Sequence, residues 1–241
     1  MIDVYKTLRE KMLKIAMDQK LLSEPVKVRA RVLTTEEAIG NPESNDFPLQ
    51  KGKERLMQAE FQGAMGQAFT DQYGDFEGVL EDALKMALEN NFRRAVFVST
   101  MNAVLRYLGW IEKTVHCRDK EPTECAVELV SYIQRKYGKV KIAMVGFQPR
   151  MVESLFSHFP LRLLDLDEDN IGTKKFGVTI ESPERTDETV DWADLIVITG
   201  TTLVNGTIGS FFKEKPLLFY GTTIAGAAHL MEWVRFCARG H

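Results

Sequence analysis

The second half of the chain alternates between short apolar runs and segments of helical pattern, and this alternation limits the possible folds more than any other feature. The run 139–147 is almost continuously apolar, which is typical of a strand covered on both faces of a sheet. Similar runs lie at 161–167, 176–182, 194–200 and 215–221, and helical patterns at 126–138, 149–159, 184–193 and from 201 onward. Strands that alternate with helices in this way predict an α/β fold with an open, mostly parallel, doubly wound sheet.

The first part of the chain follows a different pattern, in which strands precede helices. Apolar residues recur at helical spacing, and one run alternates between apolar and basic residues as a half-buried strand does. The predicted helices are 2–22, 76–91 and 92–109, the predicted strands are 26–33 and a hairpin of 55–63 with 64–72, and 40–53 is a predicted loop. We therefore expect an α+β first domain over residues 1–110 and an α/β second domain over residues 111–241.

Charge and targeting patterns exclude several classes of protein. The 241 residues carry a net charge of −3 and neither half is polarised, so we expect no nucleic-acid partner and no binding to an anionic membrane surface. Residues 1–20 are charged throughout, and no run of about 18 apolar residues exists, so we expect no signal segment and no membrane span. Three cysteines, an odd number, favour reduced thiols and a cytoplasmic location.

The ends of the predicted parallel strands carry small, polar or acidic residues. Because ligands of open parallel sheets bind beyond the carboxyl ends of the strands, these residues are the candidates for binding a cofactor or another ligand. They are Gly146, Gln148, Pro149, Asp165, Asp167, Asn170, Gly200, Thr201, Thr202, Asn205, Gly221, Thr222 and Thr223. Two of these strand ends share a Gly-Thr-Thr-apolar phrase, at 200–203 and 221–224, and we expect the two phrases to meet at one edge of the sheet.

The turn after the first of these strands, GFQPRMVE, lacks the glycine pattern that cradles a dinucleotide pyrophosphate. Asp165 or Asp167 nevertheless follows at about the separation of a ribose-binding acid, some 20 residues on, so an adenosine-type ligand stays possible. The alternative interpretation is that these two residues only flank a turn. The phrase DLDEDNIG lacks the distal glutamate of a calcium loop, which argues against a calcium site.

A second candidate group is the segment TVHCRDKEPTEC, which contains His116, Cys117 and Cys125. Imidazole and thiolate are suitable ligands for transition metals, but the paired C-x-x-C spacing of a structural zinc site is absent. Cys125 is more simply interpreted as a core residue of a helix. Cys117 lies in a charged loop, where Lys113 and Arg118 are expected to lower its pKa, and His116 could activate it as a nucleophile.

Several phrases together resemble one known family. They are GNPESNDFPLQKGKE, EFQGAMGQAFTD, EKTVHCRD, GFQPRMVE, DLDEDNIG, TGTTLVNGT and YGTTIAGAA, and they lie between Gly40 and Cys237. The set is similar to the putative heavy-metal chelation family, bacterial and archaeal proteins of unknown function. The resemblance implies an enolase N-terminal-like domain joined to a Rossmann-like domain. It also implies an active site in the cleft between them, with His116, Cys117, Asp167, Asn170, Thr201, Thr202, Asn205 and the neighbouring glycines as candidates.

Three functions are compatible with these observations. The first is binding or processing of a heavy metal or a metal-chelating small molecule in the cleft, with His116 and Cys117 as ligands of a transition metal. The second is a metal-free transferase-type enzyme that binds an adenosine-containing or phosphorylated ligand at the strand tips, with His116 and Cys117 as catalytic residues. The third is a non-catalytic small-molecule binding protein. Metal identity, oligomeric state and the existence of a reaction stay open at this stage.

Overall fold

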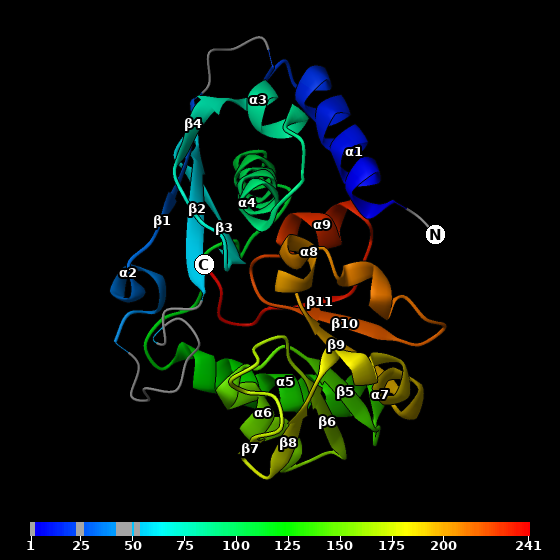
Figure 1. The fold of residues 1–241 in the computed structure, drawn as a ribbon. Helices are drawn as coiled ribbons and strands as arrows, with labels where there is room; N and C mark the ends of the chain where they lie inside the picture. The colour runs from blue at the N-terminus through cyan, green and yellow to red at the C-terminus, as the bar shows by residue number, and fades with distance from the viewer. Residues whose placement is uncertain (1–2, 23–26, 42–49, 51–53) are drawn as a thin grey trace.

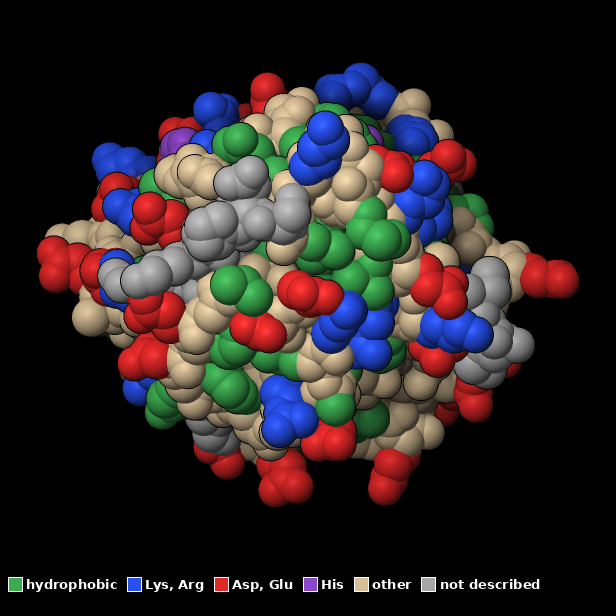
Figure 2. Space-filling view, turned by 90° about the horizontal axis from the view of Figure 1, so that it is seen from above, with side chains coloured by type: hydrophobic (Ala, Val, Ile, Leu, Met, Phe, Trp, Pro, Cys, Tyr) green, Lys and Arg blue, Asp and Glu red, His purple; other side chains and the backbone are tan. Residues whose placement is uncertain are grey.

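The computed structural model describes residues 3–22, 27–41, 50 and 54–241, with backbone alone for residues 27–30. It contains two sheets, which lie one above the other in Figure 1 with helices between and around them. The loop predicted over 40–53 falls largely outside the described residues. On the face seen in Figure 2, the described lysine and arginine side chains are interspersed with aspartate and glutamate, without a block of one sign.

The first sheet has four antiparallel strands in the order β3-β2-β1-β4. Its elements and their neighbours are α1 (Val4–Asp18), β1 (Lys27–Val32), α2 (Thr35–Ile39), β2 (Arg55–Phe61), β3 (Ala64–Thr70), β4 (Phe76–Val79), α3 (Leu80–Lys85) and α4 (Asn91–Tyr107). The predicted hairpin is confirmed as β2 and β3. Gln62 and Gly63 form its two-residue turn, both with positive φ, which matches the twist of the paired strands.

The predicted helix over 76–91 is wrong in its first four residues and again after Lys85. Residues 76–79 form β4, which pairs with β1 so that Phe76 lies opposite Ala30 and Val79 opposite Lys27. Phe76 and Val79 favour strands, and the glycine between them weakens a helix, so the open edge of β1 decides the local structure. The helix begins only at Leu80 and ends at Lys85.

Helix α4 is the centre of the first unit, and it is buried on nearly every side from Ala95 to Leu105. It packs against β2 and β3 on one side and against α8 and α9 on the other. Gly66 of β3 is where strand and helix approach most closely. A Cβ atom at this position would overlap the backbone nitrogen of Ala103 and the carbonyl oxygen of Ser99. The glycine therefore lets the sheet lie directly on the helix.

The second sheet has seven strands in the order β11-β10-β9-β5-β6-β8-β7, all parallel except the pair of β7 and β8. This confirms the predicted mostly parallel sheet and its five predicted strands. The elements are α5 (Glu121–Tyr137), β5 (Ile142–Val145), α6 (Pro149–Phe156), β6 (Leu161–Leu164), β7 (Lys174–Lys175), β8 (Val178–Glu181), α7 (Thr186–Trp192), β9 (Leu195–Thr199), α8 (Thr201–Asn205), β10 (Leu217–Tyr220), α9 (Ala225–Leu230) and β11 (Arg235–Phe236). From β5 the chain runs outward to β6 and β8, then returns to β9 on the other side.

The helix expected from residue 201 onward is only one turn long. Gly206 adopts a left-handed conformation, with φ of 78° and ψ of 9°, and ends α8 after Asn205. A short 3₁₀ helix, Ile208–Phe211, follows. Glycine takes this conformation without the steric penalty that a Cβ atom brings, which explains why the helical pattern stops here.

One hydrophobic core joins the two sheets. It contains Leu8 of α1, Phe97 of α4, Ile196 and Ile198 of β9, and Phe219 of β10. A second cluster fills the other face of the parallel sheet, under α5 and α6. Because the first core is continuous, the domain boundary expected near residue 110 stays a prediction. Within the described ranges, no helix is long and apolar enough to cross a membrane.

Candidate functional site

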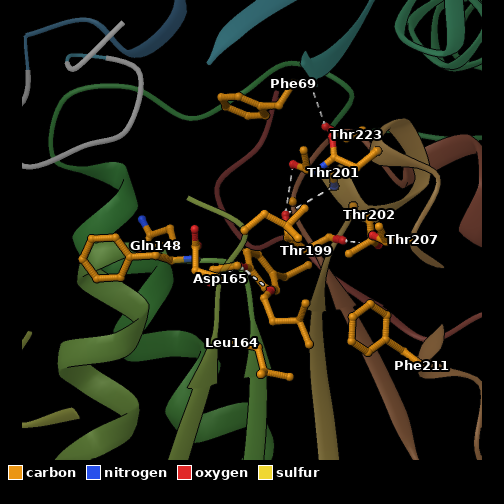
Figure 3. A pocket seen from close by; sticks show the side chains of 18 of the residues that line it. Phe69, Gln148, Leu164, Asp165, Thr199, Thr201, Thr202, Thr207, Phe211 and Thr223 are labelled. Atoms are coloured by element: carbon orange, nitrogen blue, oxygen red, sulfur yellow. Dashed lines mark hydrogen bonds between the residues drawn. The ribbon is translucent and has the colours of Figure 1, made fainter. Parts of the chain in front are cut away.

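A cavity of about 850 Å³ lies at the carboxyl ends of β5, β6, β9 and β10. Phe69 of β3 and the segment that contains His116 complete its wall, so residues from both sheets line it. Figure 3 shows Gln148 and Asp165 on one side of the cavity, the threonines of the β9 tip at its centre, and Phe211 on the opposite side. The point where strand order reverses, between β5 and β9, opens into this space.

Every candidate residue except Pro149 lines this cavity. The set consists of His116, Cys117, Gly146, Gln148, Asp165, Asp167, Asn170, Gly200, Thr201, Thr202, Asn205, Gly221, Thr222 and Thr223. Pro149 is buried as the first residue of α6, where its missing N–H costs no hydrogen bond. The structure thus brings the candidates together, while their roles as ligands of a bound molecule stay predictions.

Glycines allow the strand tips to pack closely around the cavity. Gly146 has a φ of 92°, and a Cβ atom there would lie 2.6 Å from Cγ2 of Thr199 and 3.1 Å from the hydroxyl of Tyr220. At Gly200 a Cβ atom would lie 2.6 Å from the backbone nitrogen of Ile224. The two Gly-Thr-Thr phrases therefore lie against each other at one edge of the sheet, as expected.

The threonine hydroxyls of these phrases differ in their partners. Thr202 donates to the carbonyl of Thr199 at 2.8 Å, and Thr223 accepts from the backbone N–H of Phe69 at 3.1 Å (Figure 3). The second contact ties β3 to the tip of β10. Thr222 is only 2% exposed, and its hydroxyl has no hydrogen-bond partner among the described residues. An unsatisfied hydroxyl in a cavity wall is a polar group that a ligand could satisfy.

The carboxylates after β6 organise their own loop. Asp165 accepts hydrogen bonds from the backbone N–H groups of Phe147 at 2.6 Å and Asp167 at 2.7 Å. Asp167 accepts from the N–H of Asp169 at 3.1 Å and from the side-chain amide of Asn170 at 3.3 Å. These local bonds favour the turn interpretation of the two aspartates over that of a ribose-binding acid.

Glu54, directly before β2, lines the same cavity and was not among the predicted site residues. Its pKa is raised from 4.5 to about 7, mainly by burial and in addition by repulsion from Asp165, Asp71 and Asp167. Near neutral pH this carboxyl group is therefore close to half protonated. In the sequence it follows a lysine-rich loop and looks like an ordinary solvated charge, so no local signal identifies it.

His116 is held in one orientation and is neutral. Its backbone N–H donates to Oε1 of Gln67 at 2.7 Å, and its ring makes an edge contact with Phe69 at 5.2 Å between centroids. Nδ1 lies 2.6 Å from the carbonyl oxygen of Cys117, so Nδ1 carries the ring proton and Nε2 has a lone pair. Burial lowers the pKa of His116 to about 4. A neutral histidine oriented through Nδ1 is the usual form of a metal ligand or of a general base.

The expected low pKa of Cys117 is wrong. Burial raises the pKa of this thiol, and the nearby thiols of Cys125 and Cys237 raise it further. The ammonium group of Lys113 is bound to the carbonyl of Ala238 at 2.9 Å, and Arg118 is exposed to solvent, which weakens its effect. Because the thiolate is the reactive form, a thiol with a raised pKa is a poor nucleophile at neutral pH.

Asn102 of α4 is a further residue that was not predicted, and it connects β3 to the segment after β10, where Thr223 lines the cavity. Its side-chain amide donates to the carbonyls of Gln67 at 3.0 Å and Thr223 at 3.1 Å, and its oxygen accepts from the N–H of Gly226 at 2.7 Å. Gln67 in turn holds His116, so Asn102 links the histidine to the second Gly-Thr-Thr phrase. A polar residue inside an apolar helix was the available sequence signal.

The residues present do not form a complete metal site. Among the described residues, no group of three or more His, Cys, Asp or Glu side chains is arranged to hold a metal ion. Structural zinc sites take four protein ligands and catalytic zinc sites three. The predicted pair of His116 and Cys117 therefore has no third protein ligand in the described part of the chain.

Comparisons with known proteins show a match between part of the chain and the model of one family. Residues 128–214 match the family model DUF364, described as "Putative heavy-metal chelation". A solved protein of unknown function from this family, from Pyrococcus horikoshii, is 16% identical with a TM-score of 0.55, over 91% of this chain and 79% of that one. Another, from Desulfitobacterium hafniense, is 12% identical with a TM-score of 0.50, over 73% and 72%. At these identities the likeness shows the fold alone. No curated protein matches the chain.

Proposed function

Because residues 128–214 match the heavy-metal chelation family, which confirms the resemblance seen in the motifs, we propose that this protein binds a metal-chelating small molecule together with its metal. The site is the cavity at the strand tips, and the metal is cargo. One observation carries the proposal. The cavity of about 850 Å³ offers a neutral histidine and several carboxylates, but no three protein ligands for a metal among the described residues.

The size of the cavity favours an organic ligand over a bare ion. Pockets for small organic molecules occupy roughly 300–1,000 Å³ and combine apolar walls with a few polar groups. Phe69, Phe147 and Phe211 provide apolar surface here, and the threonines and carboxylates provide the polar groups. An ion that meets fewer than three protein ligands among the described residues must obtain its other ligands from a molecule that enters with it.

His116 is the protein group best suited to complete the coordination. Its Nδ1 proton is directed to the carbonyl of Cys117, which leaves the Nε2 lone pair unprotonated down to a pH of about 4. The contact with Phe69 and the hydrogen bond from its backbone to Gln67 restrict the ring further. A restrained, neutral imidazole can bind an open coordination position without first losing a proton.

The charge of the cavity favours a neutral or cationic ligand. Glu54, Asp71, Asp165 and Asp167 all line it, and repulsion among them contributes to the raised pKa of Glu54. A cationic metal complex would relieve this repulsion and lower that pKa. An anionic complex would increase the repulsion and raise that pKa.

The strand tips are less suited to binding a pyrophosphate than to binding a cationic metal complex. At the start of α6, Pro149 has no N–H, and the side chain of Gln148 already accepts from the N–H of Met151 at 2.6 Å. The N-terminus of α6 therefore has few donors left for an oxyanion. Asp165 and Asp167 are engaged in their own loop. These contacts place the nucleotide-binding enzyme second among the functions considered.

We also infer that the second sheet is Rossmann-like, from the spatial order β8-β6-β5-β9-β10-β11 and the reversal beside β5. The enolase N-terminal-like character of the first unit is supported by the resemblance of the motifs. Under this interpretation the cavity is the cleft between the two domains. Fold alone identifies no reaction, so the proposal concerns binding.

Calorimetric titration with nickel(II) tests the proposal. The probes are the free ion, its cationic complex with the neutral amine tris(2-pyridylmethyl)amine, and its anionic complex with nitrilotriacetate. Both chelators leave open positions for a histidine. We expect the cationic complex to bind at least tenfold more tightly than either other probe, and His116→Gln to lose at least tenfold of that affinity. His229 is exposed and does not line the cavity, so His229→Gln is the matched control.

Two results would contradict the proposal. Equal binding of the cationic complex by the wild type and His116→Gln would remove the histidine from the site. Tight stoichiometric binding of free nickel(II), lost in His116→Gln, would show a resident metal site. A thermal shift with ATP or S-adenosylmethionine, without any response to the nickel complexes, would favour the nucleotide-binding enzyme instead.

A further inference from the structure

All three cysteines of the chain line the same cavity, although they are far apart in the sequence. Cys117 precedes α5, Cys125 lies within α5, and Cys237 follows β11. They are free thiols, of which Cys125 is buried and the other two are half-buried. We call these three residues the thiol wall.

The segments that bear the thiol wall are joined by backbone contacts. Val115 and His241 exchange two backbone hydrogen bonds of 2.9 Å each, directly beside the residues that lead to Cys117. Lys113 donates to the carbonyl of Ala238 at 2.9 Å, and Arg235 donates to the carbonyl of Lys113 at 2.5 Å. The segments before α5 and after β11 therefore hold each other in place, with their thiols on one wall.

The surroundings of the wall suit thiolates that form only when a metal binds. Burial raises the pKa of Cys125, while the backbone N–H groups of Ala238 and Arg239 oppose that rise. Burial lowers the pKa of Arg235, and its interaction with Cys237 opposes that fall. These donors would stabilise negative charge on sulfur once a metal ion has displaced the protons. Without a metal, Cys117 and Cys125 stay protonated at neutral pH.

The number of available ligands limits which ion can bind. No three His, Cys, Asp or Glu side chains among the described residues could hold an ion together, which argues against four-coordinate zinc. Soft monovalent ions such as Cu(I) prefer thiolates and accept only two of them in a linear arrangement. Cys125 and Cys237 are the most direct pair, because Arg239, two residues after Cys237, forms an ion pair of 3.5 Å with Glu124, the neighbour of Cys125.

We propose that the thiol wall binds one soft monovalent ion of the Cu(I) class between Cys125 and Cys237. Two sulfur–metal bonds form, two S–H bonds break, and the two protons go to solvent without any change of oxidation state. The inference goes beyond the proposed function, because it requires neither a chelator nor His116. The two sites can therefore succeed or fail separately.

Competition for Cu(I) tests this site. Fully reduced protein is titrated without oxygen into the coloured bicinchoninate complex of Cu(I), and the loss of colour reports the copper taken by the protein. We expect one ion per chain, and at least a tenfold loss of affinity in Cys125→Ser and in Cys237→Ser. Met17 is exposed on α1 and offers a soft sulfur far from the wall in the sequence, so Met17→Leu is the control and keeps full affinity.

Cys125→Ala is a second variant in case serine in the buried position disturbs folding, and circular dichroism verifies the fold of each protein. Failure of the wild type to compete for copper would overturn the proposal. Copper binding by both Cys125 variants at wild-type affinity would overturn it as well. Neither result affects the titrations with nickel complexes, which depend on His116.

Discussion

Burial determines the protonation state of two titratable groups that line the cavity, His116 and Glu54. The pKa of His116 falls to about 4 and that of Glu54 rises to about 7, so each shifts toward its neutral form. Each shift also makes the free energy of unfolding depend on pH, because the folded and unfolded chains bind the proton with different affinities. The two shifts have opposite signs and can be measured separately.

Glu54 binds its proton more tightly in the folded protein than in the unfolded chain. Its contribution to stability is therefore fully present below pH 4.5 and is lost as the pH rises through about 7. We expect Glu54→Gln to be more stable than the wild type by about 2 kcal/mol at high pH, after allowance for partial exposure, and nearly equal to it at low pH. Urea unfolding across this range measures the difference. The exposed Glu60 of the same strand gives the control Glu60→Gln, and a similar gain there would contradict the role of burial.

The contribution of His116 to stability depends on pH in the opposite direction, because the pKa of its ring in the folded protein lies below the value of 6.5 in the unfolded chain. Its contribution to stability is fully present above pH 6.5 and is lost as the pH falls through about 4. Nitrogen-15 NMR of labelled histidine should show a neutral ring with the proton on Nδ1 at neutral pH. Titration of His116 near 6.5, or a proton on Nε2, would remove the lone pair on which the proposed function depends.

At the scale of elements, α4 connects the first sheet to the cavity through Asn102. We expect Asn102→Leu to lose about 3 kcal/mol of unfolding free energy or more, because the N–H of Gly226 and several carbonyls lose their partner in a buried place. Denaturant unfolding measures the loss. Ser99→Ala is the matched control on the same helix, since its hydroxyl donates to the preceding turn, at the carbonyl of Val96 at 3.2 Å. If Asn102→Leu lost no more unfolding free energy than Ser99→Ala, the hydrogen bonds of Asn102 would not stabilise the fold more than an ordinary side-chain contact.

Sequence pattern predicted the elements whose own residues decide their structure. The parallel strands are apolar on both faces, and the hairpin has a turn of its own, so both could be read locally. The structure of residues 76–79 could not be predicted locally, because these residues pair with the edge of β1, which lies almost 50 residues earlier in the chain. The glycine at position 66 was a visible signal of close packing, but only the structure shows that its partner is α4.

Some residues of the candidate site could likewise be predicted from the sequence, and others could not. Residues at strand tips could be predicted because a parallel sheet gathers its strand ends at one edge. Glu54 and Asn102 come from the other unit, and nothing in their local sequence indicates that they meet the tips. The pKa of Cys117 was predicted wrongly for a related reason. Its charged neighbours are visible in sequence, whereas burial and the approach of Cys125 and Cys237 depend on the tertiary fold.

At the scale of the whole molecule, the cavity depends on how the two sheets are joined. Helix α4 packs on the first sheet and also on α8 and α9, which belong to the second. Arg94 of α4 donates to the carbonyl of Val204 at 2.6 Å, close to the residues that line the cavity. With the core continuous across both units, relative motion of the sheets would break apolar contacts as well as hydrogen bonds.

This shared core predicts cooperative unfolding, although two domains were expected from the sequence. We expect a single transition in denaturant, with the same midpoint by tryptophan fluorescence and by circular dichroism, because Leu8, Phe97 and Phe219 lie in one cluster. The fragment 1–110 should then remain unfolded, since it would expose the face of α4 that α8 and α9 cover. Two separated transitions, together with a folded fragment, would show that the boundary near residue 110 divides independent domains. In that case the cavity would be a cleft that can open, and binding of a ligand would have to close it.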